Sequence, residues 1–174
     1  AGLQRLVALV SAKQTDRAPG PLPLHKGVYI DEARFEAERQ KLFLGQPIVA
    51  GLSGDIPAAG DLRVFDAAGP SILVQRGKDG VARAFLNMCT HRGNPVAAGS
   101  GNASRFTCGY HGWTFKNDGA LIGVASPQDF GAIDKAAHCL TRFPVYESAG
   151  LIWATLDPNS KLDIADYLCG YDEL

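Results

Sequence analysis

Apolar and polar residues alternate in short runs over most of this chain, and these runs are separated by turn-forming Gly, Asn, Asp and Pro. This pattern predicts a mainly β protein from about residue 47 onward. We expect strands at about 47–51, 61–66, 71–76, 81–87, 105–107, 112–116, 120–124, 140–147 and 150–156. The segment LIWATL at 151–156 is apolar on both faces, which is typical of a central strand. Residues 77–80 and 117–119 are expected to form hairpin turns.

The residues ahead of these strands show helical spacing instead. Four apolar residues repeat along one face of a possible helix: Leu3, Leu6, Val7 and Val10. We therefore expect a weak amphipathic helix over 1–13, either packed against a partner subunit or simply an arm. A Pro-rich connector, PGPLPL at 19–24, follows it. Asp31 is expected to cap a second helix that ends near Phe43, and 163–169 could be a last short helix.

Length and composition set further limits. The chain has 174 residues, of which 46% are hydrophobic, enough for one well-buried domain. Its net charge of −1 gives no sign of a nucleic-acid or membrane partner. No apolar run approaches the roughly 18 residues of a membrane span, and we identify no signal peptide. Ala1 in place of Met suggests trimming or removal of the initiator.

The strongest chemical signal is a pair of mixed cysteine and histidine motifs. Cys89-x-His91 is followed, after sixteen residues, by Cys108-x-x-His111. Glycines around both motifs favour tight loops, which bring ligands together better than a strand does. Thiolates and imidazoles suit zinc or iron–sulfur rather than calcium or magnesium. Zinc fingers usually pair like with like, whereas one cysteine and one histidine in each motif match the Rieske [2Fe–2S] arrangement.

A longer stretch around the second motif carries a family resemblance. CGYHGWTF at 108–115, with Asp118-Gly119 after it, resembles the signature of aromatic-ring-hydroxylating oxygenase α subunits. The resemblance runs from about Tyr29 to Leu168. It implies a Rieske-type antiparallel β-sandwich with a [2Fe-2S] cluster-binding subdomain and a short N-terminal helix.

The same resemblance implies a division of the chain and a role for each motif. Residues 1–28 would be an N-terminal arm and connector, 29–168 the Rieske domain, and 169–174 the start of a linker to an absent catalytic domain. The resemblance implies four cluster ligands: Cys89 and Cys108 on one iron, His91 and His111 on the other.

The surroundings of these residues predict a low reduction potential. Asn94 and Tyr110 stand where respiratory Rieske proteins have a disulfide, and Trp113 and Phe115 stand where those proteins place hydroxyl donors. Fewer donors to the cluster sulfurs stabilise the reduced state less. Backbone N–H groups of the two loops are the expected donors. Trp113 is expected to be a core aromatic, with a cover over the cluster as the alternative.

By this resemblance, the chain is part of an oxidoreductase and transfers single electrons. It would take them from a ferredoxin or flavin reductase and pass them to a mononuclear iron, within an oligomer of α subunits. The Asp-x-x-His-x4-His pattern of that iron site does not occur, because Asp134 and His138 have the wrong spacing and no second His follows. No catalytic residue is therefore assigned to this chain, and the substrate stays open. A stand-alone Rieske ferredoxin and a structural zinc module remain as alternatives.

The remaining candidate residues give weaker predictions. His25, alone in the connector, is expected not to be a ligand. Cys139 and Cys169 are expected to be buried thiols of a cytoplasmic protein. The segment 89–117 contains basic residues and no acidic one, so it could attract an acidic electron donor. Its basic residues are Arg92, Arg105 and Lys116.

Overall fold

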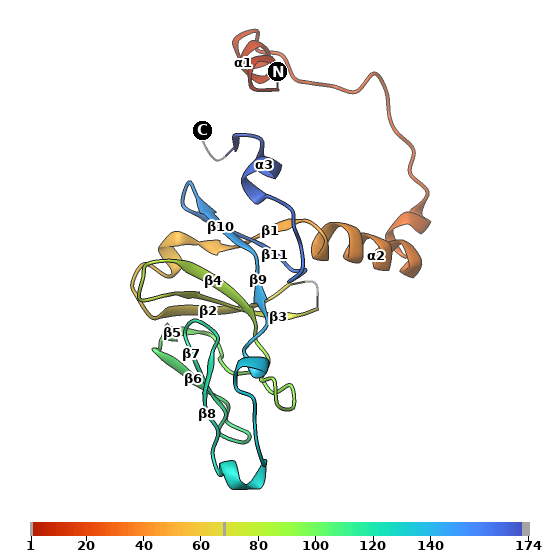
Figure 1. Cartoon of the computed structure of the whole chain (residues 1–174). Helices are drawn as coiled ribbons and strands as arrows, with labels where there is room; N and C mark the ends of the chain where they lie inside the picture. The colour runs from red at the N-terminus through yellow and green to blue at the C-terminus, as the bar shows by residue number, and fades with distance from the viewer. Residues whose placement is uncertain (1, 68, 172–174) are drawn as a thin grey trace. The chain divides into compact units, whose positions relative to one another are not determined.

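The computed structural model describes residues 2–67 and 69–171. The chain divides into two compact units, and the boundary between them in the sequence lies between Phe35 and Glu36. The first unit contains α1 (Gly2–Ser11) and the short 3-10 helix η1 (Lys26–Tyr29), and α2 (Glu32–Glu38) begins in it. The second unit contains the sheets, and only its own internal arrangement is described below (Figure 1).

The first unit confirms the helices that the sequence predicts there. The apolar face of α1 is exposed, with Leu6 57% and Val10 69% accessible. Asp31 caps α2 by accepting a hydrogen bond from the backbone N–H of Arg34 at 3.1 Å. In the second unit, helical backbone continues from Arg39 to Leu44 as a π-helix, η2, close to the predicted end at Phe43. No helix in the described part of the chain is long and apolar enough to cross a membrane.

The second unit is mainly antiparallel β structure, as predicted. One sheet has the order β1-β11-β10, a second β5-β2-β3-β4-β9 and a third β6-β7-β8. The bounds are β1 Pro47–Leu52, β2 Asp61–Asp66, β3 Ser71–Arg76, β4 Ala82–Leu86, β5 Ser100–Asn102, β6 Arg105–Thr107, β7 Thr114–Lys116, β8 Leu121–Gly123, β9 Arg142–Phe143, β10 Val145–Ser148 and β11 Leu151–Thr155. A short 3-10 helix η3 (Ser53–Asp55) follows β1, and α3 (Ile164–Leu168) closes the described chain.

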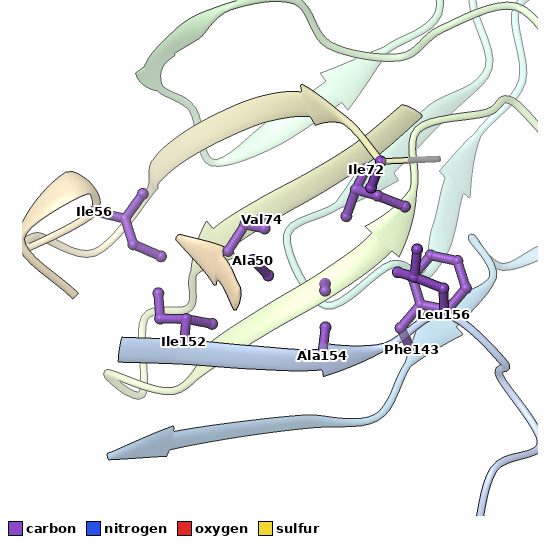
Figure 2. Packing of buried hydrophobic residues seen from close by; sticks show 11 residues of the cluster. Ala50, Ile56, Ile72, Val74, Phe143, Ile152, Ala154 and Leu156 are labelled. Carbon is purple, nitrogen blue, oxygen red and sulfur yellow. The ribbon is translucent and has the colours of Figure 1, made fainter. Parts of the chain in front are cut away.

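The five-stranded sheet is apolar on both faces because each face covers a separate core. On β3, Ile72 and Val74 point into a core shared with the β1-β11-β10 sheet, where they meet Ile152 and Ala154 of β11 (Figure 2). Leu73, the residue between them, belongs instead to a core with the β6-β7-β8 sheet. Strand side chains alternate between faces, so one strand serves both cores. The β6-β7-β8 sheet extends from one end of the five-stranded sheet, away from β1, β10 and β11 (Figure 1).

A partly buried ion pair joins the first two sheets. Arg76, at the end of β3, donates to both carboxylate oxygens of Glu147 on β10, at 2.5 and 2.7 Å. Its Nε donates to the carbonyl of Ile56 at 3.0 Å, and the Ser53 hydroxyl donates to Glu147 at 2.6 Å. The hydrogen bonds from Arg76 lower the pKa of Glu147. All three nitrogens of the Arg76 guanidinium thus have hydrogen-bond partners, which offsets the cost of placing its charge between the sheets.

The structure differs from the sequence prediction in three places. The predicted strand 140–147 is divided at Pro144, where the chain leaves β4 and joins β11, and proline lacks the N–H that would continue the first ladder. Strand β5 was missed because its residues, Ser100–Asn102, are all exposed and carry no apolar pattern. Cys139 and Cys169 are exposed, so the prediction that they are buried was wrong. Cys139 follows the 3-10 helix η5 (Ala136–His138) and Cys169 follows α3, and each thiol lies against a carbonyl of the preceding turn.

We expect Glu147→Gln to destabilise the protein by about 1–3 kcal/mol at pH 7, because Arg76 loses its charged partner. Glu147 has a lower pKa when folded than its ordinary 4.5, so its stabilising effect is present above that value. The effect is lost as the pH falls through the lowered folded pKa. Denaturant unfolding between pH 3 and 7 should show the two proteins converging at the acid end. Asp129→Asn, at an exposed carboxylate, is the control, and an equal effect of both changes would contradict the role of the ion pair.

Candidate metal centre

The first Cys–His loop, residues 89–94, follows β4 and is closed by two backbone hydrogen bonds. The N–H of Cys89 donates to the carbonyl of Asn94 at 2.8 Å, and the N–H of Gly93 donates to the carbonyl of Cys89 at 2.9 Å. Gly93 has φ +77°, a conformation that glycine adopts without steric cost. This closure turns the chain tightly enough to place Cys89 and His91 on one short loop.

The second Cys–His loop, residues 108–113, connects β6 to β7 and repeats this scheme. The N–H of Cys108 donates to the carbonyl of Trp113 at 2.8 Å, and the N–H of Gly112 donates to the carbonyl of Cys108 at 3.0 Å. Gly112 has φ +66°, and a Cβ there would lie 2.7 Å from the Cβ of Ala125. Both loops therefore place a cysteine, then a histidine, then a glycine four residues after the cysteine.

The structure brings the four sequence-predicted residues together as two pairs, one of histidines and one of cysteines. The imidazole rings of His91 and His111 lie 4.6 Å apart, edge to face. The thiols of Cys89 and Cys108 are both buried and contact each other, without a disulfide. His91 Nδ1 is buried and has no hydrogen-bond partner among the described residues, which is costly unless something else binds it.

This donor set fits a [2Fe–2S] cluster better than it fits one metal ion. Among the described residues, no group of three or more His, Cys, Asp or Glu is arranged around one ion. A [2Fe–2S] centre needs only two protein ligands on each iron. The buried Nδ1 of His91 and the adjacent thiols of Cys89 and Cys108 supply donors of the right kind.

Local charges and hydrogen bonds favour the metal-binding forms of His91 and Cys108, whereas burial works against the thiolate of Cys89. Burial, the nearby His111 and Arg92 lower the pKa of His91, which favours the neutral imidazole that a metal requires. Burial raises the pKa of the Cys89 thiol. Burial acts the same way on Cys108, but the backbone N–H groups of Tyr110 and His111, together with hydrogen bonds from Cys89 and Asn94, lower the pKa of Cys108. Such N–H groups were the expected donors to the sulfurs.

The two histidines have different surroundings. The indole of Trp113 is stacked on His91, with ring centres 5.0 Å apart and planes 8° from parallel, and Phe130 meets the same imidazole edge-on at 5.2 Å. Trp113 is 3% exposed, so it is a core residue and also covers one histidine. His111 is covered by Tyr110 at 3.8 Å, and Tyr110 is exposed. Both histidines are thus partly exposed, but His91 packs against the buried indole of Trp113, whereas the ring over His111 faces solvent.

Asn87 holds the first loop to the sheet, and sequence reasoning missed it. Its side-chain oxygen accepts from the N–H groups of Val96 and Ala97, and its amide donates to the Ala97 carbonyl and the Ser71 hydroxyl. Asn87 is 4% exposed. A polar residue at the end of the apolar run of β4, two positions before Cys89, was the available signal.

Other contacts around the loops were also missed. The side-chain amide of Asn94 donates to the sulfur of Cys108 at 3.8 Å. The sequence predicted only that Asn94 cannot form a disulfide, and not that it is a hydrogen-bond donor to the sulfur. Thr90 donates to the carbonyl of His138 at 2.9 Å, and the His138 ring lies 5.5 Å from Trp113. The segment that carries Phe130 and His138 therefore lies over the first loop. Nothing in its sequence pattern indicated this contact.

The remaining sequence candidates lie elsewhere. His25 accepts from the backbone N–H of Gly27 at 3.1 Å and caps η1. Arg105 and Lys116 face each other across β6 and β7, at the opposite end of that ladder from the second loop. Of the three basic residues considered, Arg92 alone lies on one of the two loops.

Comparison with known proteins gives a consistent set of relatives. Residues 46–144 match the Rieske [2Fe-2S] domain family. The carnitine monooxygenase oxygenase subunit of Acinetobacter baumannii is 34% identical over 149 residues, which are 85% of this chain and 40% of the relative. The α subunit of biphenyl 2,3-dioxygenase from Rhodococcus jostii is 36% identical over 143 residues, 81% of this chain and 31% of the relative.

Solved structures agree with these sequences. The apo form of a quaternary ammonium Rieske monooxygenase superposes with a TM-score of 0.80 at 33% identity, covering 87% of this chain and 44% of that one. Naphthalene 1,2-dioxygenase with indole bound gives 0.74 at 32% identity, covering 81% and 32%. The chain thus spans less than half the length of these relatives.

We expect Asn87→Ala to cost about 2–4 kcal/mol, because the buried N–H groups of Val96 and Ala97 lose their acceptor. The first loop should then hold metal poorly, and purified protein should contain less of it. Thermal unfolding and metal analysis measure both effects. Asn159→Ala, at an exposed loop position, should change neither. Full metal content in the Asn87 variant would show that the loop does not depend on this side chain.

Proposed function

The chain belongs to the Rieske [2Fe-2S] domain family, and we propose that it is the electron-accepting domain of a Rieske non-haem iron oxygenase α subunit. The observation that carries the proposal is the pair of identically closed loops, each presenting one cysteine and one histidine. The relatives are oxygenase subunits, which favours this function over a stand-alone Rieske ferredoxin.

We propose Cys89 and Cys108 as the ligands of the inner iron, and His91 and His111 as the ligands of the outer iron. When bound, the cluster supplies one-electron transfer. The chain's own residues hold it in place, direct backbone N–H groups at the cysteine sulfurs and exclude water with Trp113 and Phe130. The lowered pKa of His91 keeps its imidazole neutral for binding.

The proposed role as an electron-accepting domain implies two partners, an electron donor and an electron acceptor. The electron donor would be a ferredoxin or flavin reductase, and the acceptor a mononuclear iron in a catalytic domain of an α-subunit oligomer. The reported structure of one relative, a quaternary ammonium Rieske monooxygenase, is described as giving insight into inter-subunit electron transfer, which supports an oligomer. We place the Rieske domain at 29–168, with 1–28 as an arm and 169–174 as the start of a linker. Residues 172–174 lie outside the described residues.

For the whole oxygenase we propose insertion of oxygen into an organic substrate. Relatives named for biphenyl, benzene and anthranilate support a role in the catabolism of aromatic compounds. Others are named for carnitine, so oxidation of a quaternary ammonium compound is the second candidate. We propose the cytoplasm as its location, because thiols there stay reduced and available to iron.

Purified aerobically, the protein should be red-brown and contain about two irons and two acid-labile sulfides per chain. Cys108→Ala and His91→Ala should lose the visible spectrum, because each removes a ligand of the proposed cluster. His25→Ala is the matched control and should keep it, since His25 only caps η1. Stoichiometric zinc in a colourless protein would overturn the proposal.

The reduction potential should lie low in the Rieske range of roughly −150 to +300 mV, near or below zero. We expect Asn94→Ala to lower it further, because the amide at the Cys108 sulfur stabilises the negative charge gained on reduction. Protein-film voltammetry on cluster-loaded protein measures both. Asn102→Ala on β5 removes an amide that is bonded to Ala59 and Asp61 instead, and should leave the potential unchanged. A wild-type value above about +200 mV would place the protein with the respiratory type.

A further inference from the structure

A basic cleft of about 470 Å³ lies between the β3–β4 hairpin and the β6-β7-β8 sheet, apart from the two Cys–His loops. Its lining includes four basic side chains: Lys78, Arg83, Arg105 and Lys116. Two acidic side chains, Asp79 and Asp118, also line it, so the cleft is positively charged overall.

One of the two acidic side chains, Asp79, is already paired with Arg83. Asp79 accepts hydrogen bonds from both terminal nitrogens of Arg83, at 2.8 and 2.5 Å. These bonds lower the pKa of Asp79 and keep it charged. Lys78, Arg105 and Lys116 make no ion pair within the described residues, so the positive charge of the cleft is not balanced by the protein.

Two buried donors in the wall of this cleft lack an acceptor. Arg83 Nε and Asn117 Nδ2 are both buried, and neither has a hydrogen-bond partner in the described part of the chain. A buried donor without an acceptor costs about 1–3 kcal/mol. Two such donors in one wall add to the unbalanced positive potential beside the cleft.

The strand register adds a third, independent observation. Arg105 on β6 and Lys116 on β7 are directly opposite partners. Like charges at such cross-strand positions destabilise a hairpin. An uncharged residue at either position would remove this repulsion. An anion held between the two side chains would attract both of them and so offset the repulsion.

From these three observations we propose that the cleft binds a small dianion, with oxyanion groups of the phosphate or carboxylate class. Its charge is neutralised by Arg105 and Lys116, and the unpartnered donors of Arg83 and Asn117 add positive potential from the wall beside it. The bound anion stabilises the β6–β7 hairpin, which carries the second Cys–His loop at its other end.

The test is calorimetric titration of the cluster-loaded protein, at fixed ionic strength, with inorganic phosphate and separately with succinate. We expect saturable binding of at least one, together with a rise in the unfolding temperature that sodium chloride at matched ionic strength does not produce. Binding of phosphate alone or of succinate alone identifies the class. No saturable binding of either would overturn the proposal.

Matched variants locate the site. Lys116→Gln should weaken binding about tenfold, the loss of one charge-assisted contact. It should also raise the unfolding temperature in anion-free buffer, because the repulsion with Arg105 is removed. Lys161→Gln makes the same charge change outside the cleft and should alter neither property. Equal loss of binding in both variants would show attraction to general positive charge and would contradict the site. The visible spectrum of each variant reports separately on the cluster.

Discussion

Closure of the two Cys–His loops by backbone hydrogen bonds is the constraint on which the rest of this structure depends. Each loop bonds the N–H of its cysteine to the carbonyl five residues later, and the glycine four residues later bonds back to the cysteine carbonyl. This geometry requires a positive φ at Gly93 and Gly112. It turns backbone N–H groups toward the sulfurs and leaves each histidine beside its neighbour in the other loop.

The loops can be held rigidly because the five-stranded sheet packs on two sides. Alternate residues of β3 serve opposite cores, with Ile72 and Val74 on one side and Leu73 on the other. The buried Phe85 of β4 and Phe115 of β7 connect the sheet to the hairpin of the second loop. Asn87 then fixes the first loop to the end of the same sheet. The metal centre is thus supported from both directions by elements that are themselves buried.

Much of this could be predicted from the sequence. Alternation of apolar residues indicated most of the strands, and the spacing of two mixed Cys–His motifs indicated where the centre lies. Contacts between distant segments could not be predicted in this way. The packing of Phe130 on His91, the amide of Asn94 at the Cys108 sulfur and the pairing of the polar strand β5 depend on tertiary structure, and no local pattern records them. The exposure of Cys139 and Cys169 was not predicted because cysteine is usually buried. Both residues are C-caps, and their exposure follows from where the preceding helices end.

The central claim is that two cysteines and two histidines share one cluster, and its most direct test is pulsed electron paramagnetic resonance of the chemically reduced protein. Protein grown with ¹⁵N-histidine should show hyperfine couplings from two inequivalent histidine nitrogens, because Trp113 packs on His91 and Tyr110 packs on His111. His25→Ala should leave both couplings in place. A paramagnetic cluster without histidine coupling, or with only one, would contradict the proposed ligand set.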